Sequence, residues 1–163
     1  IYEMSGVDLQ VDLNWSSSFG EWEGSLLWSH NNNYALQSFP GDSTSDIVGR
    51  YVGSAFAEDK ANASISWTRN NLSISYLAEY IGEISADVTF FASYKQKLDA
   101  EVYHDLIASY RIGEEEKTMV SLGVTNVSDE APPYIGAGFN ANTDPSTYRM
   151  FGRSYYARIK HAF

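Results

Sequence analysis

The chain carries three histidines, the side chains best suited to acid–base chemistry near neutral pH. His30 and His104 are expected near the ends of extended segments, and His161 lies close to the last residue. Asp105 follows His104, but successive residues of a strand point to opposite faces, so we do not expect this pair to act together. Because the spacing brings no nucleophile, base and orienting group together, the sequence predicts no enzyme.

A second group of polar residues has the chemistry of a cation site. Asp42 and Asp46, with Ser and Thr between them, offer the oxygen ligands that calcium prefers. Their spacing matches no known calcium loop, and Asp and Ser are also common in solvated turns. The chain has no cysteine, which excludes disulfides and thiolate metal sites. We therefore expect a turn here, and predict neither a metal nor a cofactor.

Strands must position these residues, and the clearest strand is the final segment, residues 152–163. Its polar side chains alternate with Tyr155, Ala157 and Ile159, and the chain stops on the aromatic Phe163. Successive side chains of a strand point to opposite faces, so one face is apolar and the other polar. This pattern is typical of a barrel strand that presents one face to lipid.

Further segments alternate in the same way and are predicted to be strands. They cover residues 7–15, 21–31, 60–68, 72–81, 100–112 and 117–127. Long loops are expected at residues 32–58, 82–98 and 128–151, with a strand-like stretch at 86–94. Short turns on one side and long loops on the other are typical of outer-membrane barrels, with the loops outside the cell. The predicted fold is all-β, with about seven antiparallel strands forming part of a transmembrane barrel.

The composition agrees with this interpretation. The chain has 12 Tyr and 4 Trp, rings that collect at membrane interfaces and at sugar-binding surfaces. A net charge of -10 argues against nucleic acid as a partner. No apolar run reaches the roughly eighteen residues of a membrane helix. A soluble sandwich also has strands with one apolar face, but strands of about ten residues with Trp or Tyr near their ends favour the barrel.

An odd number of strands has a consequence for closure. If Phe163 is periplasmic, Ile1 lies outside the cell, whereas bacterial single-chain barrels have an even number of strands and both ends in the periplasm. An unpaired strand edge in lipid leaves backbone N–H and C=O groups unsatisfied. The sequence has neither an initiator Met nor a signal peptide, although an exported protein needs one. We therefore hypothesise a precursor cut in an extracellular loop before Ile1, with the remaining strands supplied by a separate chain.

Several segments resemble TonB-dependent outer-membrane receptors. GVTNVSDEAPP at residues 123–133 is similar to the penultimate-strand segment of that family, and NTDPSTY at 142–148 with GRSYY at 152–156 is similar to its last loop and strand. GVDLQV at 6–11 and SLLWS at 25–29 resemble a strand pair of the same family. Two departures are Val127, where Leu is usual, and His161, where an apolar residue is commoner.

The resemblance implies a barrel of about twenty-two strands that encloses an N-terminal plug. Residues 1–163 would be the C-terminal barrel segment, with the plug and the TonB-contacting box on the missing part. It also implies a place in the outer membrane of a Gram-negative bacterium, among lipid and lipopolysaccharide. The whole would actively import a scarce nutrient, such as a siderophore, metal complex, vitamin or oligosaccharide. The alternatives are a small independent outer-membrane barrel with an eighth strand, with or without enzyme activity, and a soluble carbohydrate-binding sandwich.

Three sets of residues follow as candidates. Charged residues expected to face the lumen and pair there or with the plug are Asp8, Asp12, Glu23, Glu79, Asp105, Arg111, Arg158 and Lys160. Loop aromatics that offer stacking faces to a small-molecule ligand are Tyr34, Phe39, Tyr51, Phe90, Tyr94, Tyr134, Phe139 and Tyr148. By analogy with such barrels, the C-terminal assembly signal comprises Tyr155, Ile159 and Phe163.

Overall fold

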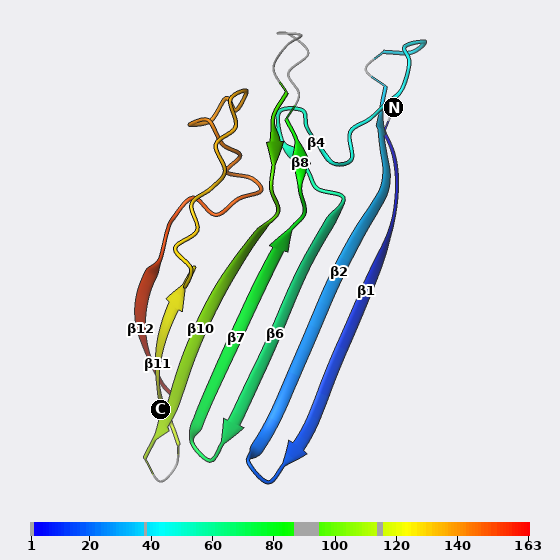
Figure 1. Cartoon of the computed structure of the whole chain (residues 1–163). Helices are drawn as coiled ribbons and strands as arrows, with labels where there is room; N and C mark the ends of the chain where they lie inside the picture. Colours follow the sequence, from blue (N-terminus) through cyan, green and yellow to red (C-terminus); the bar gives the residue numbers. More distant parts are fainter. Residues whose placement is uncertain (1, 38, 87–94, 114–115) are drawn as a thin grey trace.

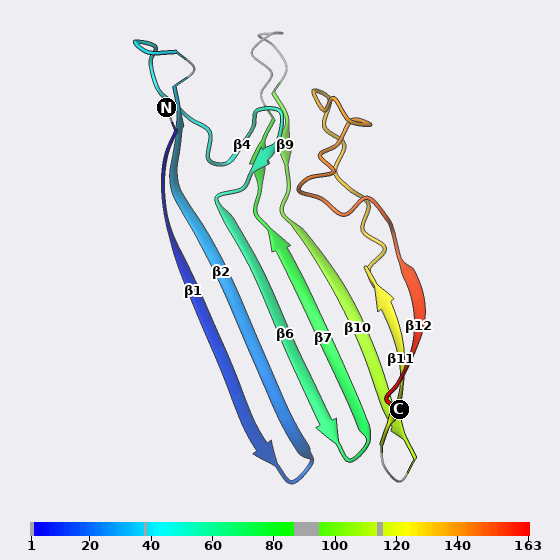
Figure 2. The same cartoon turned by 180° about the vertical axis from the view of Figure 1, so that it is seen from behind.

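The computed structural model describes residues 2–37, 39–86, 95–113 and 116–163, and these residues form strands, turns and loops without a helix. Seven long strands follow one another in chain order across one curved antiparallel sheet (Figures 1 and 2). Among the described residues there is no helix of the length and apolarity needed to cross a membrane. The predicted all-β class and the predicted succession of strands are confirmed.

The long strands have the following bounds: β1 Tyr2–Ser17, β2 Gly20–Leu36, β6 Asp59–Arg69, β7 Leu72–Ile81, β10 Glu101–Ile112, β11 Thr118–Thr125 and β12 Ser154–His161. Short strands occur between them: β3 Ser45–Asp46, β4 Arg50–Tyr51, β5 Ala55–Phe56, β8 Ile84–Ser85 and β9 Lys97–Leu98. Short turns join the long strands at one end of the sheet, and the longer loops with the short strands gather at the other (Figure 1). We call the latter the loop end.

The two faces of the sheet differ in chemistry, as two rows of paired residues show. One row on the first face joins Leu13, Gly24, Ile65, Tyr76, Leu106, Val124 and Tyr155. A row on the second face joins Ser16, Glu21, Thr68, Ser73, Ser109, Ser121 and Arg158. We call these the apolar face and the polar face. The period of two in the sequence therefore predicts the side of the sheet on which these residues lie.

Hydroxyl groups of the polar face bond to one another across neighbouring strands. The pairs are Ser25 with Ser64 at 2.8 Å, Ser66 with Ser75 at 2.8 Å, Thr68 with Ser73 at 2.9 Å, and Ser109 with Ser121 at 2.8 Å. Each pair lies on adjacent strands, where side chains of facing residues come within bonding distance. These hydroxyl pairs thus add side-chain links between neighbouring strands on the polar face.

The turn between β6 and β7 is fixed by a residue type suited to it and by the next strand. Asn70 has φ of 51°, in the left-handed region that Asn tolerates better than most residues. Asn71 accepts a hydrogen bond from the Arg111 N–H at 2.9 Å and donates from its side chain to the Arg111 carbonyl at 3.1 Å. The turn is therefore tied to β10 as well as to its own hairpin.

The first hairpin is longer than the sequence predicts. β1 begins at Tyr2 and pairs with β2 as far as Leu36, although residues 32–58 were expected to form one long loop. The polar Asn residues at 31–33 obscure the alternation, but pairing with β1 keeps them in the ladder. The pairing shifts register between Ser5 and Gly6. Glycine suits this position, because a Cβ there would come within 2.6 Å of the His30 carbonyl oxygen.

The described parts of the first two long loops contain short strands of their own. A second sheet of order β5-β4-β8-β9 unites the loop at 37–58 with the strands flanking residues 87–94. The predicted strand-like stretch at 86–94 lies largely outside the described residues. The buried apolar core is at this end of the molecule and includes Tyr51, Ile84, Tyr103 and Ile135. The side chains that pack most tightly therefore hold the loops on the sheet.

The sheet is open. Within the described residues, β1 and β12 lie at its opposite edges and each pairs with only one long strand (Figures 1 and 2). β12 runs from Ser154 to His161, two residues shorter at each end than predicted. Its apolar face is uncovered here, and Tyr155 and Ile159 are each 73% exposed.

We predict that Gly123→Ala destabilises the last hairpin by roughly 1 kcal/mol, because a Cβ at this position would overlap the Tyr156 ring that lies across it. The free energy of unfolding, measured in detergent micelles by denaturant titration, tests this. In a Tyr156→Ala background the same substitution should cost much less, since the obstructing ring is gone. Equal losses in both backgrounds would contradict the explanation.

Candidate functional site

The charged residues predicted to line a lumen share the polar face of the sheet. Their strand partners include Ser29 for Asp8, Ser25 for Asp12, Ser66 for Glu23, Leu77 for Asp105 and Met119 for both Arg111 and Lys160. Glu79 lies opposite Tyr103, and Arg158 lies opposite Ser121. They therefore form one surface, and its contact with a lumen stays a prediction.

Arg149 is the main polar residue that the sequence reasoning missed. It lies in the long loop before β12, yet its side chain reaches the polar face, where Nε donates to Glu79 at 2.8 Å and Nη1 to Asp105 at 2.6 Å. Its guanidinium also lies 5.2 Å from the centre of the Tyr103 ring. Glu79 and Asp105 thus have a partner from a loop, and no strand pattern could have predicted it.

Asn126 fixes the start of the same loop. It is 1% exposed, its N–H donates to Asp105 at 2.9 Å, and its side-chain amide donates to the Glu130 carbonyl at 2.8 Å. Its side-chain oxygen accepts from the Glu130 N–H at 2.9 Å. The Asn in the 123–133 segment therefore closes a turn at the end of β11, and this accounts physically for its place in the segment.

Asp144 joins this loop to the one that contains β4 and β5. One carboxylate oxygen accepts from the Ala55 N–H at 2.7 Å and from the Thr147 hydroxyl at 2.7 Å, and the other accepts from the Ser146 N–H at 3.1 Å. Burial raises the pKa of Asp144, but the hydrogen bonds from Ser146, Ala55 and Thr147 together lower it more, so that it lies below its ordinary value. The buried carboxylate is therefore stabilised in its charged form.

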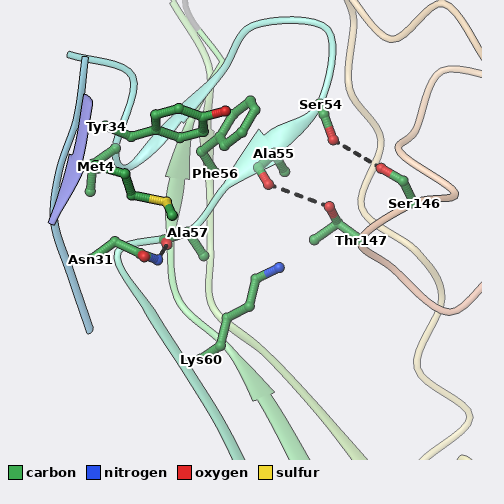
Figure 3. Close-up of a pocket in the computed structure, with 11 residues that line it drawn as sticks. Met4, Asn31, Tyr34, Ser54, Ala55, Phe56, Ala57, Lys60, Ser146 and Thr147 are labelled. Atoms are coloured by element: carbon green, nitrogen blue, oxygen red, sulfur yellow. Dashed lines mark hydrogen bonds between the residues drawn. The ribbon is translucent and has the colours of Figure 1, made fainter. Parts of the chain in front are cut away.

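A pocket of about 320 Å³ opens where these loops meet the first strands (Figure 3). Its lining residues come from β1, β2, the β4–β5 region, the start of β6 and the loop before β12: Met4, Asn31, Tyr34, Val48, Ser54, Ala55, Phe56, Ala57, Lys60, Ser146 and Thr147. Asn31 holds the wall in place by donating from its side chain to the Ala57 carbonyl at 3.0 Å. The pocket thus depends on segments far apart in the sequence.

The pocket combines an aromatic wall with a cation. Tyr34 and Phe56 meet edge to face with ring centres 5.1 Å apart. Lys60 is the second residue of β6, and its amino group is directed into the pocket (Figure 3). It is the charged member of the lining set, the other described lining residues being uncharged.

The predicted loop aromatics have different fates. Tyr34 lines the pocket, whereas Phe39, Tyr134 and Phe139 are exposed away from its lining. Tyr51 and Tyr148 are 8% and 3% exposed and belong to the core, which corrects their prediction as ligand contacts. Burial also raises the pKa of the Tyr148 hydroxyl. Phe90 and Tyr94 lie outside the described residues.

Asp42 and Asp46, considered above for a cation site, hold backbone groups in the loop. Asp42 accepts from the Phe39 N–H at 3.1 Å, and Asp46 accepts from the Tyr34 and Val48 N–H groups at 3.1 Å each. These bonds are typical of a turn. In the described part of the chain, no cluster of three potential metal ligands occurs.

The histidines bond to separate partners on the apolar side. His30 lies 2.9 Å from Asp59 Oδ1, to which Trp28 Nε1 also donates at 3.0 Å. His104 Nδ1 lies 2.7 Å from the Tyr76 hydroxyl, while Asp105 is on the opposite face with Arg149. His161 bonds to Thr118 at 2.8 Å. The three rings are thus not brought together.

We predict that Asp144→Asn loosens the loop before β12, because Asn has one acceptor oxygen in place of two. Its amide nitrogen cannot accept either the bonds from Ala55 and Thr147 or those from Ser146. We expect a loss of about 1 to 3 kcal/mol in local stability. Limited proteolysis of the loop should accelerate accordingly, with Asp42→Asn, on an exposed turn, as the matched control.

The lowered pKa of Asp144 predicts a pH dependence with a definite sign. A group whose pKa is depressed by folding stabilises the folded state fully above its ordinary value, here 3.8, and loses that contribution as the pH falls through the lower folded value. Loop proteolysis by an acid-stable protease should therefore rise below pH 3.8 in the unaltered protein. Asp144→Asn should remove this part of the pH response; an unchanged response would contradict the assignment.

The geometry of the sheet resembles that of known receptors, although no protein-family profile and no curated protein matches the sequence. The ferric enterobactin receptor of Pseudomonas aeruginosa in complex with BCV-L6 aligns with a TM-score of 0.65 and 18% identity, over 98% of this chain and 22% of that chain. A mutant of that receptor in complex with enterobactin aligns with a TM-score of 0.65 and 16% identity, again over 98% and 22% of the two chains.

These solved structures are receptors and not enzymes. At this identity the likeness establishes the fold, and this chain spans 22% of the length of the receptor chains. The expected resemblance to a receptor of this type is thereby confirmed at the level of fold. The chain has the fold of one segment of a receptor β-barrel.

Proposed function

We propose that this chain is the C-terminal barrel segment of a TonB-dependent outer-membrane transporter that actively imports a scarce nutrient. The observation that carries the proposal is a single open sheet with one apolar and one polar face, matched to 22% of a receptor chain. The apolar face would contact lipid and the polar face the lumen. The nutrient classes considered are siderophores, metal complexes, vitamins and oligosaccharides.

The open edges support a partner that supplies the remaining strands. Unpaired N–H and C=O groups in hydrocarbon cost several kcal/mol each by the usual estimate, about 3 or more. Both β1 and β12 have one such edge among the described residues. Strands and a plug domain outside this chain, on a separate or continuous polypeptide, would close the barrel. Coupling to TonB would belong to that remainder.

A soluble carbohydrate-binding sandwich requires a second sheet packed on the apolar face. The second sheet of the described chain has two-residue strands and lies at the loop end instead. Leu9, Leu13 and Leu122, all on the apolar face, are 46%, 57% and 61% exposed. These exposures favour the barrel, whose apolar face is covered by lipid.

Fractionation of cells that produce the protein tests the membrane assignment. The protein should be found in the outer-membrane fraction and should need detergent for extraction. It should purify with polypeptide that supplies the rest of the barrel, because this chain spans only 22% of the matched receptor chain. Energy-dependent uptake of labelled nutrients then tests transport. A monodisperse protein in detergent-free buffer would refute the proposal.

The C-terminal assembly signal gives a prediction of its own. Phe163→Asp places a charge in the interfacial aromatic band next to His161, whose ring lies 4.9 Å from that of Phe163. We expect surface levels to fall at least about threefold, since charged residues on the lipid side oppose insertion. Phe163→Tyr, which keeps an interfacial aromatic, is the control; equal levels of all three proteins would contradict the proposed orientation.

A further inference from the structure

We propose that the pocket around Lys60 binds a ring-borne carboxylate that also carries hydroxyl groups. This inference rests on the proposed receptor function and deepens it by naming a class of ligand. The shared chemistry is found in acidic sugars and in hydroxylated aromatic acids. The polar groups that line the pocket, and the hydrogen bonds that some of them already make within the protein, support this ligand class.

Lys60 is the first of these groups. It is partly exposed, lines the pocket, and directs its ammonium group into it (Figure 3). The nearest acidic residue in sequence, Asp59, lies on the opposite face of β6, where it bonds to His30 and Trp28. Within the described residues no acidic side chain lines the pocket, and the Asp144 carboxylate lies behind its wall, bonded to Ser146 and Thr147. Lys60 is therefore the group of this lining that attracts an anion. A lysine ammonium can donate up to three hydrogen bonds and suits a carboxylate.

The hydroxyl groups beside Lys60 have a defined polarity. Ser146 Oγ donates to Asp144 at 2.5 Å, and Thr147 Oγ1 donates to the same carboxylate at 2.7 Å. Ser146 Oγ also lies 2.9 Å from Ser54 Oγ, and Thr147 Oγ1 lies 3.4 Å from the Ala55 carbonyl oxygen (Figure 3). A hydroxyl has one hydrogen and two lone pairs, so each of the two oxygens keeps at least one lone pair that can accept a hydrogen bond. The matching groups of a ligand are donors, which means hydroxyl groups or N–H groups.

The third side of the pocket is apolar and partly aromatic. Met4, Tyr34 and Phe56 line it, with the Tyr34 and Phe56 rings at an interplanar angle of 75°. Ring faces and edges of this kind pack against the flat carbon surface of another ring. A volume of about 320 Å³ is enough for one such ring. A compact ring that bears both carboxylate and hydroxyl groups meets all three requirements.

The test measures binding of small acids and their neutral amides to the complete protein in detergent. The probes are glucuronate with glucuronamide, and salicylate with salicylamide, measured by isothermal titration calorimetry. Lys60→Gln should weaken binding of the preferred acid roughly tenfold and change binding of its amide little, because only the acid loses a charge-assisted hydrogen bond. Lys60→Arg should retain most of the affinity, since it keeps the positive charge.

Two further variants distinguish a direct contact between Lys60 and the ligand from a structural effect on the pocket. Lys97→Gln removes the same charge from an exposed lysine at the loop end that pairs with Glu83 at 2.7 Å, and it should leave all affinities unchanged. Asp144→Asn should weaken acid and amide alike, because it loosens the wall that carries Ser146 and Thr147. The stronger of the two acids identifies whether the ring is a sugar or an aromatic one.

Three results would overturn the inference: no saturable binding of either acid at millimolar concentration, equal losses in the Lys60 and Lys97 variants, or equal losses of acid and amide in Lys60→Gln. None of these results bears on membrane location, which fractionation measures independently. A protein found in the outer membrane that fails these binding tests would keep the proposed function and lose the ligand class.

Discussion

The constraint on which the rest of the structure depends is that each long strand satisfies its backbone sideways, against its two neighbours. In an apolar medium no solvent can take over a lost partner, so a sheet of this kind is stable only as a continuous ladder. The alternation of side chains gives each strand one apolar and one polar face. In the proposed barrel these faces would contact lipid and water. The open edges at β1 and β12 are the places where this chain alone does not meet the constraint.

Packing at the loop end follows a different principle. Many apolar side chains of the sheet are exposed in this chain, whereas the loops have a buried core of their own. Three polar residues connect the loop before β12 to the rest: Asn126 to the end of β11, Asp144 to the β4–β5 region, and Arg149 to β7 and β10. Buried polar groups of this kind are stable only when their bonds are complete. These bonds therefore fix the position of the loop on the sheet, and with it the position of the pocket wall formed by Ser146 and Thr147.

The period of two in the sequence was enough to predict the long strands and to place the eight charged residues named for the lumen side on one face of the sheet. Rows such as Leu13, Ile65 and Leu106 follow from alternation, because register is specified wherever one face differs from the other. The extension of β2 through an Asn-rich stretch was not predicted, since its pairing depends on β1 and on a bulge at Gly6.

The candidate site was much less accessible to sequence reasoning. Tyr34 was predicted to face a ligand, but Lys60, Ser146 and Thr147 have no local signal and meet only through the fold. The burial of Tyr51 and Tyr148 was not predicted, because the sequence of a loop does not show whether an aromatic side chain in it is buried or exposed. Arg149 was missed for the same reason, since ion pairs between a loop and a strand leave no periodic trace.

The hydroxyl pairs of the polar face have a consequence for the way this face meets water. Ser25 with Ser64, Ser66 with Ser75, and Ser109 with Ser121 bond to each other across adjacent strands. Each pair uses one hydroxyl hydrogen within the sheet, and the second hydrogen and the remaining lone pairs stay available to water. Hydration of the polar face therefore leaves these links between strands in place.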